Sequence, residues 1–114
     1  MKNLLAVLSI ALTSTFVAAP VQASTIGQSV CEYVAADDKS RLRSFLKTNK
    51  LKIRNIYDGL ECNGANLLAF ASDKNAVKTG SLIISKLPKK TVEAHLASIK
   101  SAELSAAAQK RVNG

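Results

Sequence analysis

Two cysteines, Cys31 and Cys62, constrain the fold of this chain more than any other feature of its sequence. They are its only cysteines, and they follow an N-terminal segment that is typical of exported proteins. Because exported proteins mature in an oxidising compartment, the pair favours a disulfide, with free thiols or a bridge to a second chain as the alternatives. Such a disulfide closes a loop of about 30 residues and stabilises a small fold by roughly 3–4 kcal/mol. We therefore expect it to tie the first helix to a turn in the middle of the chain.

The N-terminal segment has the three parts of a secretory signal peptide. Lys2 supplies the positive charge, residues 4–19 form an apolar run, and Val21-Gln22-Ala23 ends in a small residue suited to cleavage. The run is rather short for a transmembrane helix, so we expect residues 1–23 to be removed and no membrane span to remain; a retained anchor is the alternative. The other 114 − 23 = 91 residues are enough for one domain, which we expect at 24–114.

The exported part repeats apolar residues at intervals of three and four, which is typical of helices that bury one face. Leu42, Phe45 and Leu46 form the clearest of these stripes. The expected segments are a polar lead-in at 24–28, helices at about 30–35, 39–48, 67–72 and 76–87, a loop or single helical turn at 51–57, and a last helix at about 92–110. The predicted fold class is all-α: a small bundle or stack of about two antiparallel helix pairs plus a C-terminal helix, with one disulfide.

Local signals mark where the helices begin and where the chain reverses. Either Asp37 or Asp38 can cap the second helix, because both precede it directly and both carry a side-chain acceptor. Asn66 can cap the third helix in the same way. Asn63-Gly64 supplies two residues that tolerate positive φ, so a tight reversal is expected between Cys62 and that cap.

The core is expected at about residues 28–90, with the C-terminal helix less firmly attached. Gly80 weakens a helix interior by about 1 kcal/mol relative to Ala, so we expect another helix to pack closely against it. From Ser101 onward small and charged residues dominate, and few large apolar groups are left to bury. We therefore expect the last helix to dock weakly.

The strongest charge signal lies between residues 39 and 57, which contain seven basic residues and one apolar stripe but no acidic residue. Positions three and four apart share one helix face, and the segment after the helix extends the basic run. We assign a candidate anion-binding or partner-binding surface to Lys39, Arg43, Lys47, Lys50, Lys52 and Arg54. The alternative is a solvated helix flank, which is the usual role of a charge run on a small helical domain.

No group of residues in the sequence has the pattern of a catalytic or metal site. His95 is the only histidine, and no serine or cysteine motif accompanies it. Two cysteines and one distant histidine do not make a zinc site. The carboxylates show no spacing that singles out an acid and a base. We therefore expect no metal, no cofactor and no enzymatic activity.

Two passages are similar to parts of an ankyrin repeat. Residues 64–71 keep the Gly, one Leu and the closing Ala of the opening of such a repeat, and residues 37–46 resemble its second helix. The resemblance implies a stack of antiparallel helix pairs.

A resemblance to another family covers more of the chain, roughly residues 28–90. The segments that carry it are Asp-Asp-Lys-Ser-Arg-Leu-Arg (37–43), Leu-Lys-Ile-Arg-Asn-Ile-Tyr (51–57), Cys-Asn-Gly (62–64), Leu-Leu-Ala-Phe-Ala (67–71) and Ser-Lys-Leu-Pro (85–88). Together they resemble the domain-of-unknown-function family 3718 of small exported bacterial proteins. The resemblance, with the signal peptide, implies a periplasmic location; it implies no activity, ligand or active site.

Two functions fit these features; a hydrolase is a third alternative, for which the sequence offers no catalytic constellation. The exported part has 16 − 1 = 15 basic and 8 acidic residues, a net charge of 15 − 8 = +7, so an anionic lipid, polysaccharide, nucleic acid or acidic protein can be its partner. The sequence favours a periplasmic, non-enzymatic interaction module that binds an unknown envelope protein, as stacked helix pairs often do. The alternative is an anion binder that uses the basic helix face on phosphate-bearing ligands.

Overall fold

The computed structural model describes residues 21–114, so most of the predicted signal peptide, residues 1–23, lies outside the described residues. The described part contains seven α-helices, two 3₁₀ turns and one two-stranded antiparallel sheet. The helices are α1 (Val21–Ala35), α2 (Lys39–Thr48), α3 (Ile53–Ile56), α4 (Leu67–Asp73), α5 (Val77–Lys86), α6 (Lys89–Ala94) and α7 (Ala102–Asn113). The turns are η2 (Tyr57–Gly59) and η3 (Leu96–Ser98), and the strands are β1 (Glu61–Cys62) and β2 (Ala65–Asn66). The predicted all-α class is confirmed.

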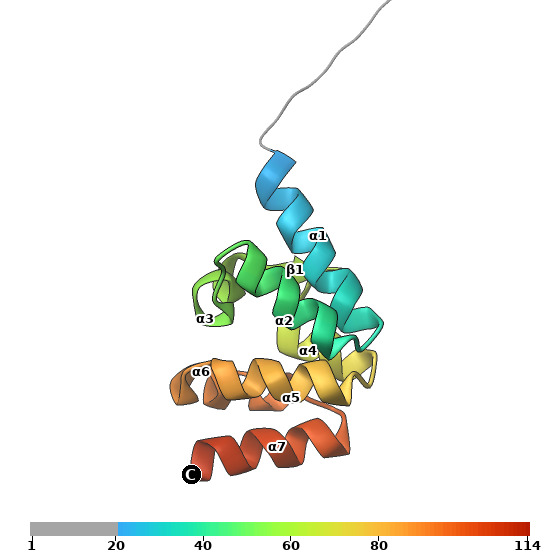
Figure 1. Cartoon of the computed structure of the whole chain (residues 1–114). Coiled ribbons are helices and arrows are strands. Elements are labelled where there is room, and N and C mark those ends of the chain that lie inside the picture. The colour runs from blue at the N-terminus through green and yellow to red at the C-terminus, as the bar shows by residue number, and fades with distance from the viewer. Residues whose placement is uncertain (1–20) are drawn as a thin grey trace, which may run out of the picture.

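Helix α5 lies in the middle of the arrangement (Figure 1). It contacts α2 and α4 on one side and α7 on the other, while α1 packs on α2 and α4. The buried apolar side chains of all these helices belong to one cluster, which includes Val34 of α1, Leu42 of α2, Leu68 of α4, Ile83 of α5 and Leu104 of α7. The predicted stripe of α2 supplies Leu42 and Leu46 to this cluster, whereas Leu104 of α7 belongs to no predicted stripe.

The two adjacent aspartates before α2 have different roles. Asp38 is the N-cap of α2, and its carboxylate accepts a hydrogen bond from the backbone N–H of Arg41 at 3.1 Å. Asp37 has a positive φ of 53° and turns its carboxylate towards the start of α5. There it accepts hydrogen bonds from the N–H groups of Lys78 and Thr79, at 3.3 and 2.8 Å, and from the Thr79 hydroxyl at 3.1 Å. Asp37 therefore caps a helix that begins 40 residues later in the chain.

A short β-hairpin, with two residues in each strand and two in the turn, precedes α4, although no strand was predicted there. Cys62 pairs with Ala65, and Asn63 and Gly64 between them have positive φ values of 55° and 77°. Two central residues with positive φ are the requirement of a type I′ turn, so the predicted reversal at Asn63-Gly64 is confirmed. Each strand has only two residues, which is too short for any alternating pattern. Asn66 then caps α4, as predicted, by accepting a hydrogen bond from the Ala69 N–H at 2.8 Å.

The first helix is longer than the sequence pattern indicates. Residues 24–28 belong to α1 and are not a separate lead-in. Gly27 lies against Leu60: a Cβ atom at Gly27 would be 3.1 Å from Leu60 Cδ1. This contact continues the buried face that Val30 and Val34 begin, so tertiary packing extends the helix through a polar segment.

The predicted single helix at 92–110 is wrong, because the chain divides there into α6, η3 and α7. The hydroxyl of Ser72 in α4 accepts hydrogen bonds from the backbone N–H groups of Lys100 and Ser101, both at 2.7 Å. Ser101 then caps α7 by accepting from the Leu104 N–H at 3.4 Å. The helical hydrogen-bond pattern is interrupted because a buried side chain from another helix takes the place of the backbone partner.

The expected weak docking of the C-terminal helix is also wrong. Leu104 and Ala108 of α7 are fully buried, with 1% and 0% of their surface exposed. A Cβ atom at Gly80 would lie 2.6 Å from Leu104 Cδ2, so the absence of a side chain at Gly80 makes room for α7. The predicted close packing at Gly80 is therefore confirmed. Further along, Arg111 of α7 meets Leu87 just after α5, so the two helices run in the same direction.

Candidate anion-binding groove

A groove of about 720 Å³ lies between α2, α3, α5 and α7. Its walls come from the second half of α2, the segment from Leu51 to Arg54, the last turns of α5 with Leu87 and Pro88, and Arg111 of α7. We call this feature the basic groove. Its cationic lining residues are Arg43, Lys47, Lys52, Arg54, Lys86 and Arg111; its apolar ones are Leu46, Leu51, Ile53, Leu82, Leu87 and Pro88; and Ser44 and Ser85 complete it.

The lining of the basic groove contains no acidic residue from the described part of the chain. Between residues 21 and 114 the one ion pair joins Arg41 and Asp38, and neither of these residues lines the groove. Six positive charges therefore face one concave surface without a carboxylate partner. Such a site concentrates positive potential, since a cleft with low-dielectric walls focuses the field of the charges that line it.

The C-terminal ends of three helices offset part of this positive charge. Lys47, Lys86 and Arg111 lie in the last turns of α2, α5 and α7, where a cation is stabilised by the negative end of the helix dipole. Each helix end carries roughly half a negative charge, so three ends offset about 1.5 of six positive charges. Arg43 and Lys52 lie outside any last turn. The groove therefore keeps a clear excess of positive charge.

Four of the six residues predicted for a basic surface line the groove, namely Arg43, Lys47, Lys52 and Arg54. Lys39 and Lys50 are exposed but do not line it. Lys39 is in the first turn of α2, two helical turns before Lys47, and Lys50 has a positive φ of 55° beyond the end of the same helix. The structure thus separates the predicted set into a group of four around one cavity and two residues outside it.

Two cations of the groove were not predicted. Lys86 lies at the end of α5, more than 30 residues after the basic run, and Arg111 lies near the end of the chain. The half-buried Arg111 side chain reaches from α7 to α5, where its Nη2 atom donates a hydrogen bond to the Leu87 carbonyl oxygen at 3.0 Å. Its Nε atom is buried without a hydrogen-bond partner. The only sequence signal at Lys86 and Arg111 is that each is a basic residue in the last turn of its helix, α5 or α7. This signal does not indicate that the ends of these two helices lie close together.

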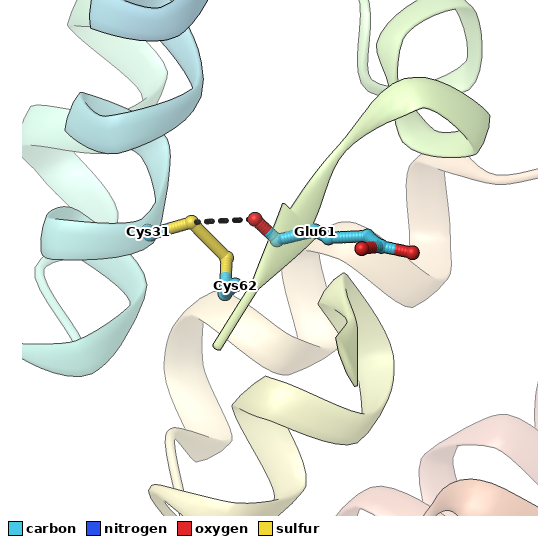
Figure 2. The surroundings of a disulfide bond; sticks show 3 residues. All are labelled: Cys31, Glu61 and Cys62. Atoms are coloured by element: carbon cyan, nitrogen blue, oxygen red, sulfur yellow. Dashed lines mark hydrogen bonds between the residues drawn. A yellow bond between two sulfur atoms is a disulfide. The ribbon is translucent and has the colours of Figure 1, made fainter. Parts of the chain in front are cut away.

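The disulfide lies away from the basic groove and has a structural role. Figure 2 shows Cys31 of α1 bonded to Cys62 of β1, with an S–S distance of 2.03 Å and a Cα–Cα distance of 5.8 Å. Cys31 Sγ also lies 3.7 Å from the carbonyl oxygen of Glu61. The predicted intramolecular pairing is confirmed, and it fastens the first helix to the hairpin. Because disulfides form in oxidising compartments, it indicates an exported protein.

His95 and Tyr57 form a packed pair and not a reactive centre. Their ring centroids are 5.4 Å apart. His95 Nδ1 lies 3.0 Å from the Thr91 carbonyl oxygen, and it must donate there because a carbonyl oxygen can only accept. The Tyr57 hydroxyl donates to Asn66 Oδ1 at 3.0 Å. Burial raises the pKa of Tyr57 to about 12, so its phenol keeps its proton at neutral pH. Both side chains hold η3 and the α4 cap together.

Between residues 21 and 114, no group of three or more His, Cys, Asp or Glu residues has an arrangement that could hold a metal ion. No helix in this part of the chain is both long enough and apolar enough to cross a membrane.

Comparison with known protein families places this fold and groove in a family. The family model "Protein of unknown function (DUF3718)" matches residues 30–94, which include the disulfide and α2 to α6. The chain belongs to this family. No curated protein and no solved structure matches it. Five of the six groove cations of this DUF3718 protein lie inside the matched region, whereas Arg111 and the rest of α7 lie beyond it.

The predicted DUF3718 resemblance is therefore confirmed, whereas the ankyrin-like resemblance is not. Residues 64–71, which resemble the start of an ankyrin repeat, form the end of a hairpin turn, strand β2 and most of α4. The Gly and Leu that suggested the repeat serve here as a turn residue and a buried helix residue.

Proposed function

We propose that this DUF3718 protein binds an anionic, phosphate-bearing ligand in the basic groove and that its role is not enzymatic. One observation carries the proposal: six cations from four separate segments line one cavity without an acidic residue among the lining side chains. Folding brings like charges together at a cost, and a bound anion offsets that repulsion. The lining also lacks a histidine, cysteine or carboxylate, so the proposal assigns no proton transfer or nucleophilic step to the groove.

The types of cation support phosphate as the charged group. Arg43, Arg54 and Arg111 carry planar guanidinium groups, which can offer two parallel N–H donors to phosphate or carboxylate oxygens. The three lysines add mobile point charges around them. The volume of the groove, about 720 Å³, lies within the range of roughly 300–1,000 Å³ that is common for small-molecule sites.

This proposal takes the second of the two functions that the sequence allows. An envelope protein that docks on the helix pairs stays a prediction, and no feature of the described surface favours a particular partner. We further propose that the protein acts in the periplasm after removal of residues 1–23. The disulfide and the order of parts in the N-terminal segment support that location.

A pair of double variants tests the proposal. Arg43→Gln with Lys47→Gln removes two charges inside the groove, whereas Lys39→Gln with Lys50→Gln removes two charges outside it. Both variants have the same net charge, and all four side chains are exposed. Binding of pyrophosphate to the disulfide-bonded residues 24–114 is measured by titration calorimetry at low and high ionic strength. We expect the groove variant to bind about tenfold more weakly, because each charged contact contributes roughly 0.5–1 kcal/mol at a partly exposed site.

The control variant is expected to bind pyrophosphate as tightly as the unmodified protein does. High salt is expected to weaken pyrophosphate binding by the control variant and by the unmodified protein, because salt screens the charges. Equal losses in the two double variants would mean that net charge alone attracts the anion. Absence of pyrophosphate and alkyl phosphate binding at low salt would refute the proposed function.

A further inference from the structure

The basic groove is lined by apolar as well as charged side chains. Alongside its cations it is lined by the side chains of Leu46, Leu51, Ile53, Leu82, Leu87 and Pro88. Leu51 and Pro88 are only half-buried, so these two keep apolar surface in contact with solvent at the groove. A site for a small hydrated anion gains nothing from such surface, since apolar surface is stabilised only when it is removed from water.

The size of the groove also indicates a ligand larger than a small anion. The space that a phosphate group occupies is on the order of a few water molecules, each of which takes about 30 Å³ in the liquid. A groove of about 720 Å³ is therefore several times larger than its charged ligand group requires. The remaining space borders the apolar lining, where a hydrocarbon chain can replace water with a gain in free energy.

From these two observations we infer that the ligand is a single amphiphilic molecule: a phosphorylated lipid with one acyl chain, whose phosphate contacts the cations and whose chain lies along the apolar lining. This inference rests on the proposed function and adds the ligand class to it. Charge complementarity selects the phosphate end. The apolar lining selects the chain.

The placement of the cations allows a lipid molecule inside the groove to be distinguished from an intact membrane surface. A flat anionic surface attracts every exposed lysine and arginine near it to a similar degree. Lys39 and Lys50 are exposed, like every groove cation except the half-buried Arg111, but they lie outside the cavity. A ligand held in the groove therefore distinguishes Lys47 from Lys39, whereas a bilayer does not.

The test is a chain-length series on the unmodified, disulfide-bonded residues 24–114. Pyrophosphate, butyl phosphate, octyl phosphate and dodecyl phosphate are titrated by calorimetry, each below its micelle concentration. Every methylene that becomes buried raises affinity about fourfold, so partial burial of the chain is expected to make octyl phosphate bind at least about tenfold more tightly than butyl phosphate. Dodecyl trimethylammonium, which has the same chain and the opposite charge, is expected not to bind.

A matched pair of variants locates the chain. Leu51→Asn changes an apolar residue of the groove, and Leu96→Asn changes a similarly half-buried leucine in η3, outside it. We expect Leu51→Asn to weaken octyl phosphate binding about threefold or more while pyrophosphate binding stays unchanged, and Leu96→Asn to alter neither. Thermal unfolding confirms that each variant is folded, and the chain-length series on the unmodified protein stands if one of them is not.

The outcomes separate this inference from the proposed function. If pyrophosphate and all alkyl phosphates bind with the same affinity, the groove binds anions but not lipids, and the inference is overturned. If none of these anions binds, the proposed function itself fails. If an acidic amphipathic peptide binds more tightly than dodecyl phosphate and displaces it, the groove serves a protein partner and the lipid assignment is wrong.

Discussion

Replacing Asp37 is expected to destabilise the protein far more than replacing its neighbour Asp38. The carboxylate of Asp37 accepts three hydrogen bonds at the start of α5, two of them from the backbone N–H and hydroxyl of Thr79. Thr79 is completely buried, and both its N–H and its hydroxyl use this carboxylate as their acceptor. Asp38 caps α2 at the surface, where water can satisfy the freed N–H of Arg41.

The magnitude follows from these contacts. Loss of an N-cap costs about 1 kcal/mol, and leaving the buried donors of Thr79 unsatisfied adds roughly 1–3 kcal/mol. Glycine is the informative replacement, because Asp37 has a φ of 53° and glycine adopts that conformation without strain. We expect Asp37→Gly to lower the free energy of unfolding by about 3 kcal/mol. Asp38→Gly is expected to lower it by only a few tenths, since glycine is tolerated at a solvated N-cap.

Urea denaturation followed by far-ultraviolet circular dichroism measures both variants, with the disulfide kept intact. The expected loss for Asp37→Gly corresponds to a decrease in melting temperature of about 15 °C for a domain of this size. Asp37→Asn, which keeps one acceptor oxygen and tolerates positive φ, is expected to lose about 1 kcal/mol. Equal stabilities of Asp37→Gly and Asp38→Gly would refute the reasoning, because they would show that the contact across the chain contributes nothing.

Three further predictions concern other parts of the fold. Replacing Cys31 and Cys62 together by Ser is expected to lower the free energy of unfolding, measured by urea denaturation, by about 4 kcal/mol, because the disulfide joins residues 31 positions apart. In the unmodified protein, mass spectrometry without reduction should find no thiol that can be alkylated. Burial raises the pKa of Tyr57 from 10.0 to about 12, so the neutral phenol stabilises the folded state fully below pH 10. About 2 kcal/mol of that stability is expected to disappear as the pH rises from 10 to 12, and a Tyr57→Phe variant that shows the same loss would contradict this. Gly80→Ala is expected to destabilise by about 1–2 kcal/mol because its Cβ would meet Leu104 Cδ2 at 2.6 Å, although alanine normally favours a helix. Leu104→Ala alone should cost about 2–5 kcal/mol, and in the double variant the two costs should not add if the side chains meet as described.

The helices could be predicted well where their own side chains form the pattern. The stripe of Leu42, Phe45 and Leu46 and the breaks around it were enough to locate α2, whose predicted and observed bounds agree. The C-terminal helix was predicted poorly for a physical reason. The break between α6 and α7 depends on the hydroxyl of Ser72, which hydrogen-bonds to backbone groups 28 and 29 residues away. The helix propensities of neighbouring residues contain no information about a hydrogen bond over such a sequence separation.

The candidate site was predicted only in part for the same reason. Arg43, Lys47, Lys52 and Arg54 are close in sequence, so helix spacing and a short loop suffice to place them together. Lys86 and Arg111 join them because α5 and α7 pack in the same direction, which depends on the missing side chain at Gly80. The apolar lining that the ligand proposal uses also comes from several elements and has no single signal in the sequence.

What the sequence determined by itself is therefore the local part of this protein: where α2 begins and ends, where the chain reverses at Asn63-Gly64, which cysteines can pair and where positive charge accumulates. Each of these follows from residues within a few positions of one another or from composition. The tertiary structure alone decided that Asp37 caps α5, that α7 docks on the core and that the charges enclose a groove. Those features arise from contacts between segments 24 to 42 residues apart, and their energies exist only once the chain has folded.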